Sequence, residues 1–315
     1  MTNLIFSFNA IAPLFFMVAL GYYLKKKKVA GQNFFDTVTD FSFNYLFPFI
    51  MFRQIYTMDI AANINSTFIF YGTGVLVVLV ILLLICCPLV IKERPTCGAF
   101  IQGSFRSNSV LMAVALSLIV FGEEGSGPTV MLLPFITILY NLIAVIVLTL
   151  MSSENKELDI GGIAIKIIKN PLIIGAVAGL AVSLLNIELP SFMVSVVDDL
   201  ASMATPLALI ALGGQLELDT LFARPALLFS ATFIKLIIAP LAAVVPALLF
   251  FDFTRNEIGA LLFIFSAPTA VSSYPMAKAM KCDSDLAGRI IMYSTVLSAF
   301  TIFLWLYLFK TLNYI

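Results

Sequence analysis

The stretch GSFRSNSVLMAVALSLIVFG, residues 103–122, is long and apolar enough for a membrane-spanning helix, yet its first third is polar. That part carries Arg106, Asn108 and three serines, whereas the remainder is almost entirely apolar. An arginine in the hydrocarbon of a bilayer costs about 2.5 kcal/mol or more. The stretch therefore predicts that Arg106 faces a water-accessible site within the protein and not lipid.

The whole chain has the composition of a membrane protein. Of its 315 residues, 61% are hydrophobic and only 11% are charged, whereas soluble domains have about 45–50% and about 25%. Apolar runs long enough to span a bilayer recur from end to end. Lipid tolerates no unpaired backbone groups, and these runs are too long for the strands of a barrel. The sequence therefore predicts an all-α membrane protein.

Several kinds of site are excluded or disfavoured by what the chain lacks. It contains no histidine, which excludes metal, haem and proton-relay sites built on that residue. Its four cysteines show no Cys-x-x-Cys spacing, and no nucleophile–base constellation or phosphate-binding motif occurs. The zero net charge gives no indication of nucleic-acid binding. We therefore expect no catalytic residue, no metal, no cofactor and no nucleic-acid partner.

Ten transmembrane helices follow from the apolar runs and the short loops between them. The first 28 residues lack a basic leader region and a cleavage site, so we expect a retained first span and not a signal peptide. The predicted spans are 4–24, 34–56, 67–91, 97–122, 127–151, 170–187, 191–214, 223–250, 256–280 and 286–311.

Lysine and arginine are distributed unequally between alternate loops. Of the 18 in the chain, thirteen fall on one side of the membrane in this span order, three fall on the other, and Arg106 and Lys235 lie within spans. Positively charged loops tend to stay in the cytoplasm. We therefore expect an inner or plasma membrane protein with both termini outside the cytoplasm. The thirteen are Lys25, Lys26, Lys27, Lys28, Lys92, Arg94, Lys156, Lys166, Lys169, Arg224, Lys278, Lys281 and Arg289.

The second half of the chain repeats features of the first half at a shift of 158 residues. Each half holds five spans, and because five is odd, the two halves enter the membrane in opposite orientations. We expect two inverted five-helix repeats, residues 1–152 and 170–315, joined by a cytoplasmic loop at 153–169. Such repeats are typical of secondary transporters. The matching pairs are Pro13 with Pro171, Pro48 with Pro206, Pro88 with Pro246, Gly21 with Gly179, and Asp40 with Asp198.

The repeat also indicates broken helices in the fourth and ninth spans. Asn108 corresponds to Ser266, which lies in FSAPTAVSSYP, residues 265–275. Asn108 or the serine after it can cap a new helix, and so can Ser266 or the alanine after it, with Pro268 in the first turn. Two helices that begin near the bilayer midplane present their positive dipole ends there. The sequence thus predicts crossed discontinuous helices around an anion site that Arg106 strengthens.

Four quoted segments resemble the bacterial auxin efflux carrier family, which includes proteins described as malate and malonate permeases. They are FRSNSVLMAVALSLIVFGEEG, KNPLIIGAVAGLAVSLLNIELP, ATPLALIALGGQLEL and SAPTAVSSYPMAKAMKCDSDLAGRIIMYSTVLSAFTIFLWLYLF, and the resemblance covers essentially the whole chain. It implies a ten-helix fold like that of the bile-acid sodium symporters and NhaA-type antiporters. Spans 1, 2, 6 and 7 would form a scaffold, spans 3–5 and 8–10 a mobile transport domain, and two copies would pair through the scaffolds.

One departure from this family concerns the fourth span. The family usually has glycine and proline five and seven residues after the asparagine, and this chain has Ala113 and Ala115 there. Alanine favours helix. We therefore expect a less pronounced break, which rests on the polar segment 103–109.

Arg106 is the first candidate for binding a substrate, because a planar guanidinium suits a carboxylate. The alternative is a structural ion pair with an aspartate of the scaffold. Residues beside it and at the ninth-span break could contact a small acid, or could instead cap and pack helices. These are Ser107, Asn108, Ser109, Pro268, Thr269, Ser272 and Ser273.

Four other ionisable residues lie within predicted spans. Lys235, in the eighth span, is either a second positive group near the site or the partner of a buried acid, and it could carry a coupling proton. Asp40 and Asp198 are related by the repeat, and Asp199 adjoins the latter. These aspartates could carry protons or bind sodium, or could form gates or ion pairs between domains.

The sequence as a whole predicts a secondary transporter of small organic anions, such as malate or malonate, that works by alternating access. A carrier of aromatic or hydrophobic weak acids, and a non-transporting sensor with the same fold, remain alternatives. A cation/proton antiporter is a third, but it would need an acidic residue at the helix crossing. The expected partners are the anion, H⁺ or Na⁺ as a coupling ion, membrane lipid and a second copy of the chain.

Overall fold

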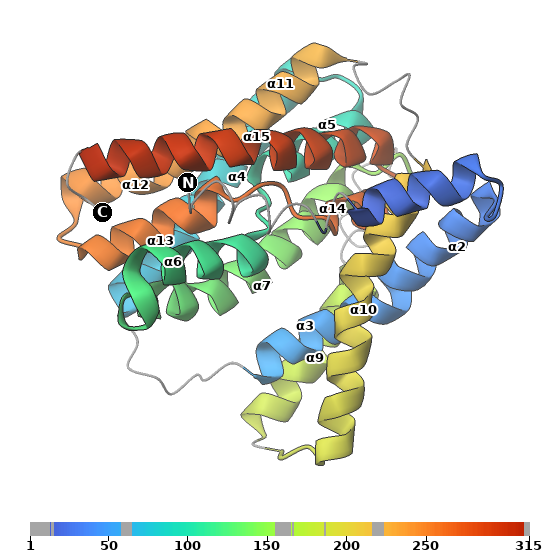
Figure 1. Cartoon of the computed structure of the whole chain (residues 1–315), viewed down its shortest axis with the longest axis horizontal. Helices are drawn as coiled ribbons and strands as arrows, with labels where there is room; N and C mark the ends of the chain where they lie inside the picture. The colour runs from blue at the N-terminus through green and yellow to red at the C-terminus, as the bar shows by residue number, and fades with distance from the viewer. Residues whose placement is uncertain are drawn as a thin grey trace.

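The computed structural model describes residues 16–57, 65–154, 167–185, 187–215 and 224–311, together with residues 13 and 165. Within that part of the chain every regular element is a helix, so the prediction of an all-α protein is confirmed there. Figure 1 shows two groups of helices: α2, α3, α9 and α10 lie together on one side, and most of the others lie on the opposite side.

The helices follow one another in this order, after a first helical segment at residues 16–26. They are α2 Gln32–Phe41, η1 Ser42–Leu46, α3 Phe47–Tyr56, α4 Ser66–Val90, α5 Arg94–Phe105, α6 Ser109–Gly125, α7 Gly127–Met151, α9 Pro171–Leu184, α10 Ser191–Gln215, α11 Pro225–Phe233, η3 Ile234–Ile238, α12 Ala239–Phe250, α13 Arg255–Ser266, α14 Ser273–Ala279 and α15 Ser284–Thr311. The elements η1 and η3 are single turns of π-helix inside longer helical runs.

Five helical stretches in the described residues are long and apolar enough to cross a membrane. They are Ser66–Val90, Gly127–Met151, Ser191–Gln215, Pro225–Phe250 and Ser284–Thr311. They coincide with five of the predicted spans, because an apolar run of about 20 residues is a strong signal for a spanning helix.

The other five predicted spans are not single long α-helices in the described residues. The span at 34–56 is one helical run, α2–η1–α3, with a π-turn in its middle. The span at 170–187 contains α9, of only 14 residues. The spans at 97–122 and 256–280 are each divided into two helices. Most of the first span, at 4–24, and most of the loop at 153–169 lie outside the described residues.

Glycine allows close contacts among the helices of the first group and between that group and the helical segment 16–26. A methyl group added at Gly21 would lie 2.0 Å from the carbonyl oxygen of Ile210 in α10, and one added at Gly179 in α9 would lie 2.7 Å from the carbonyl oxygen of Phe52 in α3. Neither position can hold a side chain without separating the helices. Small residues at helix contacts are typical of proteins that pack within a bilayer.

In the second group, the starts of α4 and α13 are joined by polar side chains. Thr254 and Glu257 form a reciprocal capping box at the start of α13. Asn65 caps α4 through Phe68 N–H, and its side-chain amide also donates to Glu257 (2.6 Å). These contacts fix the start of one divided span against its neighbour.

Candidate functional site at the crossing of two broken helices

The predicted fourth and ninth spans are both interrupted in the structure. Helix α5 ends at Phe105, Arg106 is extended (φ −73°, ψ 130°), and α6 begins at Ser109. The break is therefore a full interruption, despite Ala113 and its companion alanine further along α6. It lies in the polar segment that the sequence indicated.

The ninth-span break has a different form from the one that we predicted. Helix α13 continues to Ser266, and Ala267 is extended (φ −62°, ψ 146°). The next helix, α14, begins only at Ser273, after Ser272. The prediction that Pro268 occupies the first turn of a helix capped at 266 or 267 is thus wrong. A residue before proline is pushed towards extended geometry, which here ends α13 and leaves Pro268 in the link.

The two links meet at the crossing and bond to each other. Ser107 and Thr269 form an antiparallel bridge, and the Asn108 N–H donates to the carbonyl of Pro268 (2.7 Å). In each break, a side-chain hydroxyl also donates a hydrogen bond to a backbone carbonyl of the helix that ends at the opposite break. Thr269 donates to the Gly103 carbonyl of α5 (2.8 Å), and Ser107 donates to the Ile264 carbonyl of α13 (2.6 Å). Carbonyls left free where α5 and α13 stop are thereby satisfied within the protein.

Both kinds of helix end lie at this crossing, not only the amino ends that we expected. Helices α6 and α14 begin there, and α5 and α13 end there. The carboxyl ends carry negative partial charge, which favours cations beside them. Lys235 is fully buried in η3 and donates to the carbonyl of Phe265, in the last turn of α13 (2.6 Å). The structure thus places Lys235 on a backbone carbonyl, a partner that neither sequence alternative named.

Arg106 is buried beside the crossing, with only 3% of its surface exposed. One guanidinium nitrogen donates to the side-chain oxygen of Asn141 in α7, and another donates to the sulfur of Met276 in α14. No salt bridge joins Arg106 to a carboxylate among the residues that the structure describes, and these include the four aspartates of α2 and α10, Asp36, Asp40, Asp198 and Asp199. The alternative of an ion pair with a scaffold aspartate is therefore contradicted.

Arg106 and its two partners, Asn141 and Met276, each follow a polar residue by three or four positions, and these preceding residues lie in α5, α7 and α14. We call this set the Arg106 pocket; it comprises Gln102, Arg106, Thr137, Asn141, Ser273 and Met276. The Nε2 of Gln102 lies 3.8 Å from the same sulfur that Arg106 contacts. The side-chain oxygens of Gln102, Thr137 and Ser273 are buried and have no hydrogen-bond partner. Buried polar atoms are rarely left unpaired in proteins, so these three oxygens are candidates for hydrogen bonds to a ligand.

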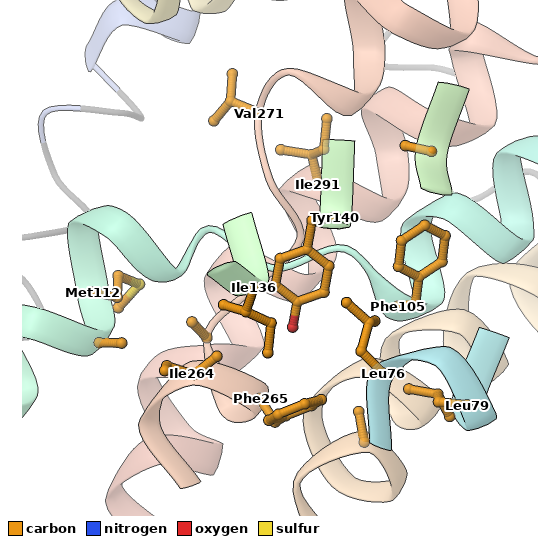
Figure 2. Packing of buried hydrophobic residues seen from close by; sticks show 14 of the residues in the cluster. Leu76, Leu79, Phe105, Met112, Ile136, Tyr140, Ile264, Phe265, Val271 and Ile291 are labelled. Atoms are coloured by element: carbon orange, nitrogen blue, oxygen red, sulfur yellow. The ribbon is translucent and has the colours of Figure 1, made fainter. Parts of the chain in front are cut away.

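Apolar side chains surround the crossing on the other sides. Figure 2 shows Tyr140 among Ile136, Phe105 and Phe265, with its hydroxyl directed towards the interior. The Phe105 and Tyr140 rings are stacked, with 6.2 Å between their centroids. The last turn of α5, which directly precedes Arg106, is therefore held against α7 by a rigid aromatic contact.

The remaining candidates from the sequence divide into two sets. At the crossing, Ser107 and Thr269 use their hydroxyls on helix carbonyls, which favours the capping alternative, while the Ser109 oxygen is buried and has no partner. Asn108 and Ser272 are partly exposed. Away from the crossing, Asp198 forms a half-exposed ion pair with Arg53 in α3 (2.8 Å). The other two aspartates, Asp40 in α2 and Asp199 in α10, are exposed.

A second polar cluster, which the sequence analysis missed, links α14 to the first group of helices. Lys278 of α14 forms an ion pair with Asp36 of α2 and donates to Gln215 of α10 (2.6 Å). Gln215 also accepts from the hydroxyl of Tyr274 and donates to Thr39 (3.1 Å). We call these five residues the α14 anchor. Lys278 was counted only as a cytoplasmic charge, because sequence spacing does not reveal partners far away in the chain.

Asn141, Gln102 and Met276 were also missed as neighbours of Arg106. One signal was available for Asn141: it is a single amide in the middle of the predominantly apolar 25-residue helix α7. Polar residues inside a span are costly and therefore functional candidates. The contact of Met276 with Arg106 had no comparable signal.

Comparisons with known proteins identify the family of this chain. A family model described as "Membrane transport protein" matches residues 6–306. A protein of Rhizobium meliloti (strain 1021) named "Putative malonate transporter" is 24% identical over 305 residues, which cover 96% of this chain and 95% of that protein.

Proposed function

Because the chain belongs to the membrane transport protein family, the auxin efflux carriers that its sequence resembles, we propose that it is a secondary transporter of small organic anions. Malonate and similar dicarboxylates are the substrates that we favour, since the relative described above bears the name of a malonate transporter. The Arg106 pocket would bind the anion.

The observation that carries this proposal is the unpaired charge of Arg106. Its guanidinium is buried, and its partners in the described residues are an amide oxygen and a thioether sulfur, both neutral. A buried charge is very unfavourable unless it is paired. A carboxylate can accept two parallel hydrogen bonds from a guanidinium and neutralise it. An organic anion therefore completes the site chemically, and the unpaired oxygens nearby can receive the rest of the molecule.

The transport mechanism that we propose is alternating access between two inverted five-helix repeats. Two close contacts support the repeat: Gly21 against Ile210, and Gly179 against Phe52. Adding 158 to 21 gives 179, and adding 158 to 52 gives 210, so the repeat relates one contact to the other. The scaffold would contain residues 16–26, α2–α3, α9 and α10, and the remaining helices would form the transport domain.

The same proposal assigns a contact that closes one access state and candidate sites for a coupling ion. We place the α14 anchor at the cytoplasmic side, where it would hold the transport domain against the scaffold in one of the two access states. Asp40, Asp198 and Asp199 are the candidates for binding H⁺ or Na⁺, and they lie in α2 and α10, which we assign to the scaffold. Homodimer formation through the scaffold remains an expectation from the family resemblance.

Uptake of radiolabelled malonate into proteoliposomes tests the function. The wild-type protein should accumulate malonate, and Arg106→Met should reduce uptake at least about tenfold, because a charge-assisted hydrogen bond contributes about 1.5–3 kcal/mol. Arg255→Met, at an exposed position at the start of α13, is the matched control and should transport normally. Imposed pH and sodium gradients in the same vesicles identify the coupling ion. Normal uptake by Arg106→Met would remove Arg106 from the site.

A further inference from the structure

The Asn141 side chain is held in one orientation beside Arg106. Its Nδ2 donates to the carbonyl of Thr137, one turn earlier in α7 (2.8 Å). Since an amide nitrogen cannot accept a hydrogen bond from a guanidinium, the oxygen of Asn141 must be the atom that faces Arg106. The orientation of this amide is therefore determined by chemistry on both of its sides.

Asn141 thus positions Arg106 without neutralising it. A carboxylate has nearly the same shape as an amide and would make an internal ion pair here, as arginine usually does when it is buried. The amide accepts a hydrogen bond on one edge of the guanidinium and leaves its full positive charge in place. The choice of amide over carboxylate decides whether Arg106 is available to an external anion.

Met276 holds the other edge of the guanidinium by a weaker contact. A thioether sulfur is a weak acceptor, and a methionine side chain is flexible enough to move aside. Its sulfur also lies 3.8 Å from the Gln102 amide nitrogen, so one atom occupies the position between two donors. A carboxylate oxygen in that position would accept from both donors more strongly than sulfur does.

We propose that Asn141 is the positioning residue that orients Arg106 and leaves its positive charge unneutralised and free for the substrate, and that a substrate carboxylate replaces the Met276 sulfur on the guanidinium. This inference rests on the proposed function, because it assigns roles around the same anion site. It specifies that anion selectivity depends on a neutral partner at residue 141 and not on the number of positive charges nearby.

Three substitutions separate this electrostatic role from simple packing. Asn141→Asp keeps the shape of the side chain but adds a negative charge, and Asn141→Ser loses packing and the contact with Arg106 but stays neutral. Asn170→Asp is the matched control: Asn170 is also buried, also lies beside a methionine sulfur (3.9 Å from Met280), and caps α9 through Leu172 N–H, a task that aspartate performs equally well.

The measurement is the thermal stabilisation of the purified full chain by malonate, titrated for each variant, since a ligand stabilises the folded state by mass action. We expect Asn141→Asp to weaken the malonate response at least about 100-fold, because like charges placed side by side cost several kcal/mol. Asn141→Ser should weaken it less than about tenfold, and Asn170→Asp should leave it unchanged. A structural role would give the reverse order, with serine more harmful than aspartate.

Met276→Leu keeps the test valid if Asn141→Asp does not fold. Leucine has a similar volume and no acceptor, so malonate binding should be retained or become tighter, and its loss would overturn the inference. A normal response of Asn141→Asp would also overturn the inference but leave the proposed function intact, provided that Arg106→Met has lost its response. A normal response of Arg106→Met, or none in the wild type to any small dicarboxylate, would overturn both.

Discussion

Thr269 and Ser107 show how single hydroxyls make the crossing possible. Each donates to a carbonyl of the opposite broken helix, in a region where both residues are buried and water cannot take their place. An unpaired buried carbonyl costs about 1–3 kcal/mol. The crossing is therefore stabilised by pairs of groups whose members lie about 160 residues apart in the sequence.

Replacing Thr269 by valine tests this role. The variant keeps the shape of the side chain but leaves the Gly103 carbonyl unpaired, so the free energy of unfolding should fall by about 1–3 kcal/mol. Equilibrium unfolding in detergent, followed by the fluorescence of Trp305, the single tryptophan, measures the change. Thr301→Val is the control, because Thr301 is partly buried and bonds within its own helix at 3.4 Å. A stable variant that no longer binds malonate would instead make Thr269 a substrate ligand.

The sequence was informative about Arg106 and uninformative about what surrounds it. A charge in a predicted span has a cost large enough to require a protein environment, and the structure provides one. The neutral partners Asn141 and Met276 come from α7 and α14, and no local pattern links them to α5. Lys235 illustrates the same limit: its burial could be predicted, but its bond to the Phe265 carbonyl depends on tertiary packing.

At the scale of elements, long apolar runs predicted helices well, and the positions of helix ends were harder. The fourth-span break falls where the polar residues are, since α6 begins directly after Asn108. The ninth-span link is longer than predicted, because Pro268 extends the chain beyond α13 before α14 can begin. A proline reliably indicates that a helix breaks, but it does not show how many residues later the next helix begins.

Helix α14 is the element whose movement the proposed mechanism requires, because the α14 anchor joins it to α2 and α10. A cross-link between Asp36→Cys and Lys278→Cys, in a chain whose four native cysteines have been replaced, should reduce malonate uptake to background. The reagent should be a reducible bifunctional thiol reagent, so that reduction restores uptake. The physical reason is that a covalent link prevents the separation that alternating access needs.

The control for this cross-link is a second pair within one group of helices. Asn65 and Glu257 are in contact at the starts of α4 and α13, both of which we assign to the transport domain. Cross-linking cysteines at these two positions should leave uptake unchanged. Full transport with the α14 anchor cross-linked would contradict motion of α14 against the scaffold.

At the scale of the whole molecule, composition alone determined the class of protein, and the family comparison confirmed it. The contacts of Gly21 and Gly179 add support for the repeat that was inferred from proline spacing, since a shift of 158 residues relates them. The grouping of helices in Figure 1 could not be predicted from hydropathy, because hydropathy does not distinguish one apolar run from another. It depends on which faces carry small residues and polar contacts.

The central claim is that one buried guanidinium at the crossing of two broken helices binds the carboxylate of an organic anion. Calorimetric titration of malonate and of an aromatic monocarboxylate into the wild-type protein and Arg106→Met tests it most directly. We predict saturable malonate binding by the wild type, weaker binding of the aromatic acid, and at least about tenfold loss of affinity for malonate in the variant. Equal malonate affinity in the two proteins would contradict the claim.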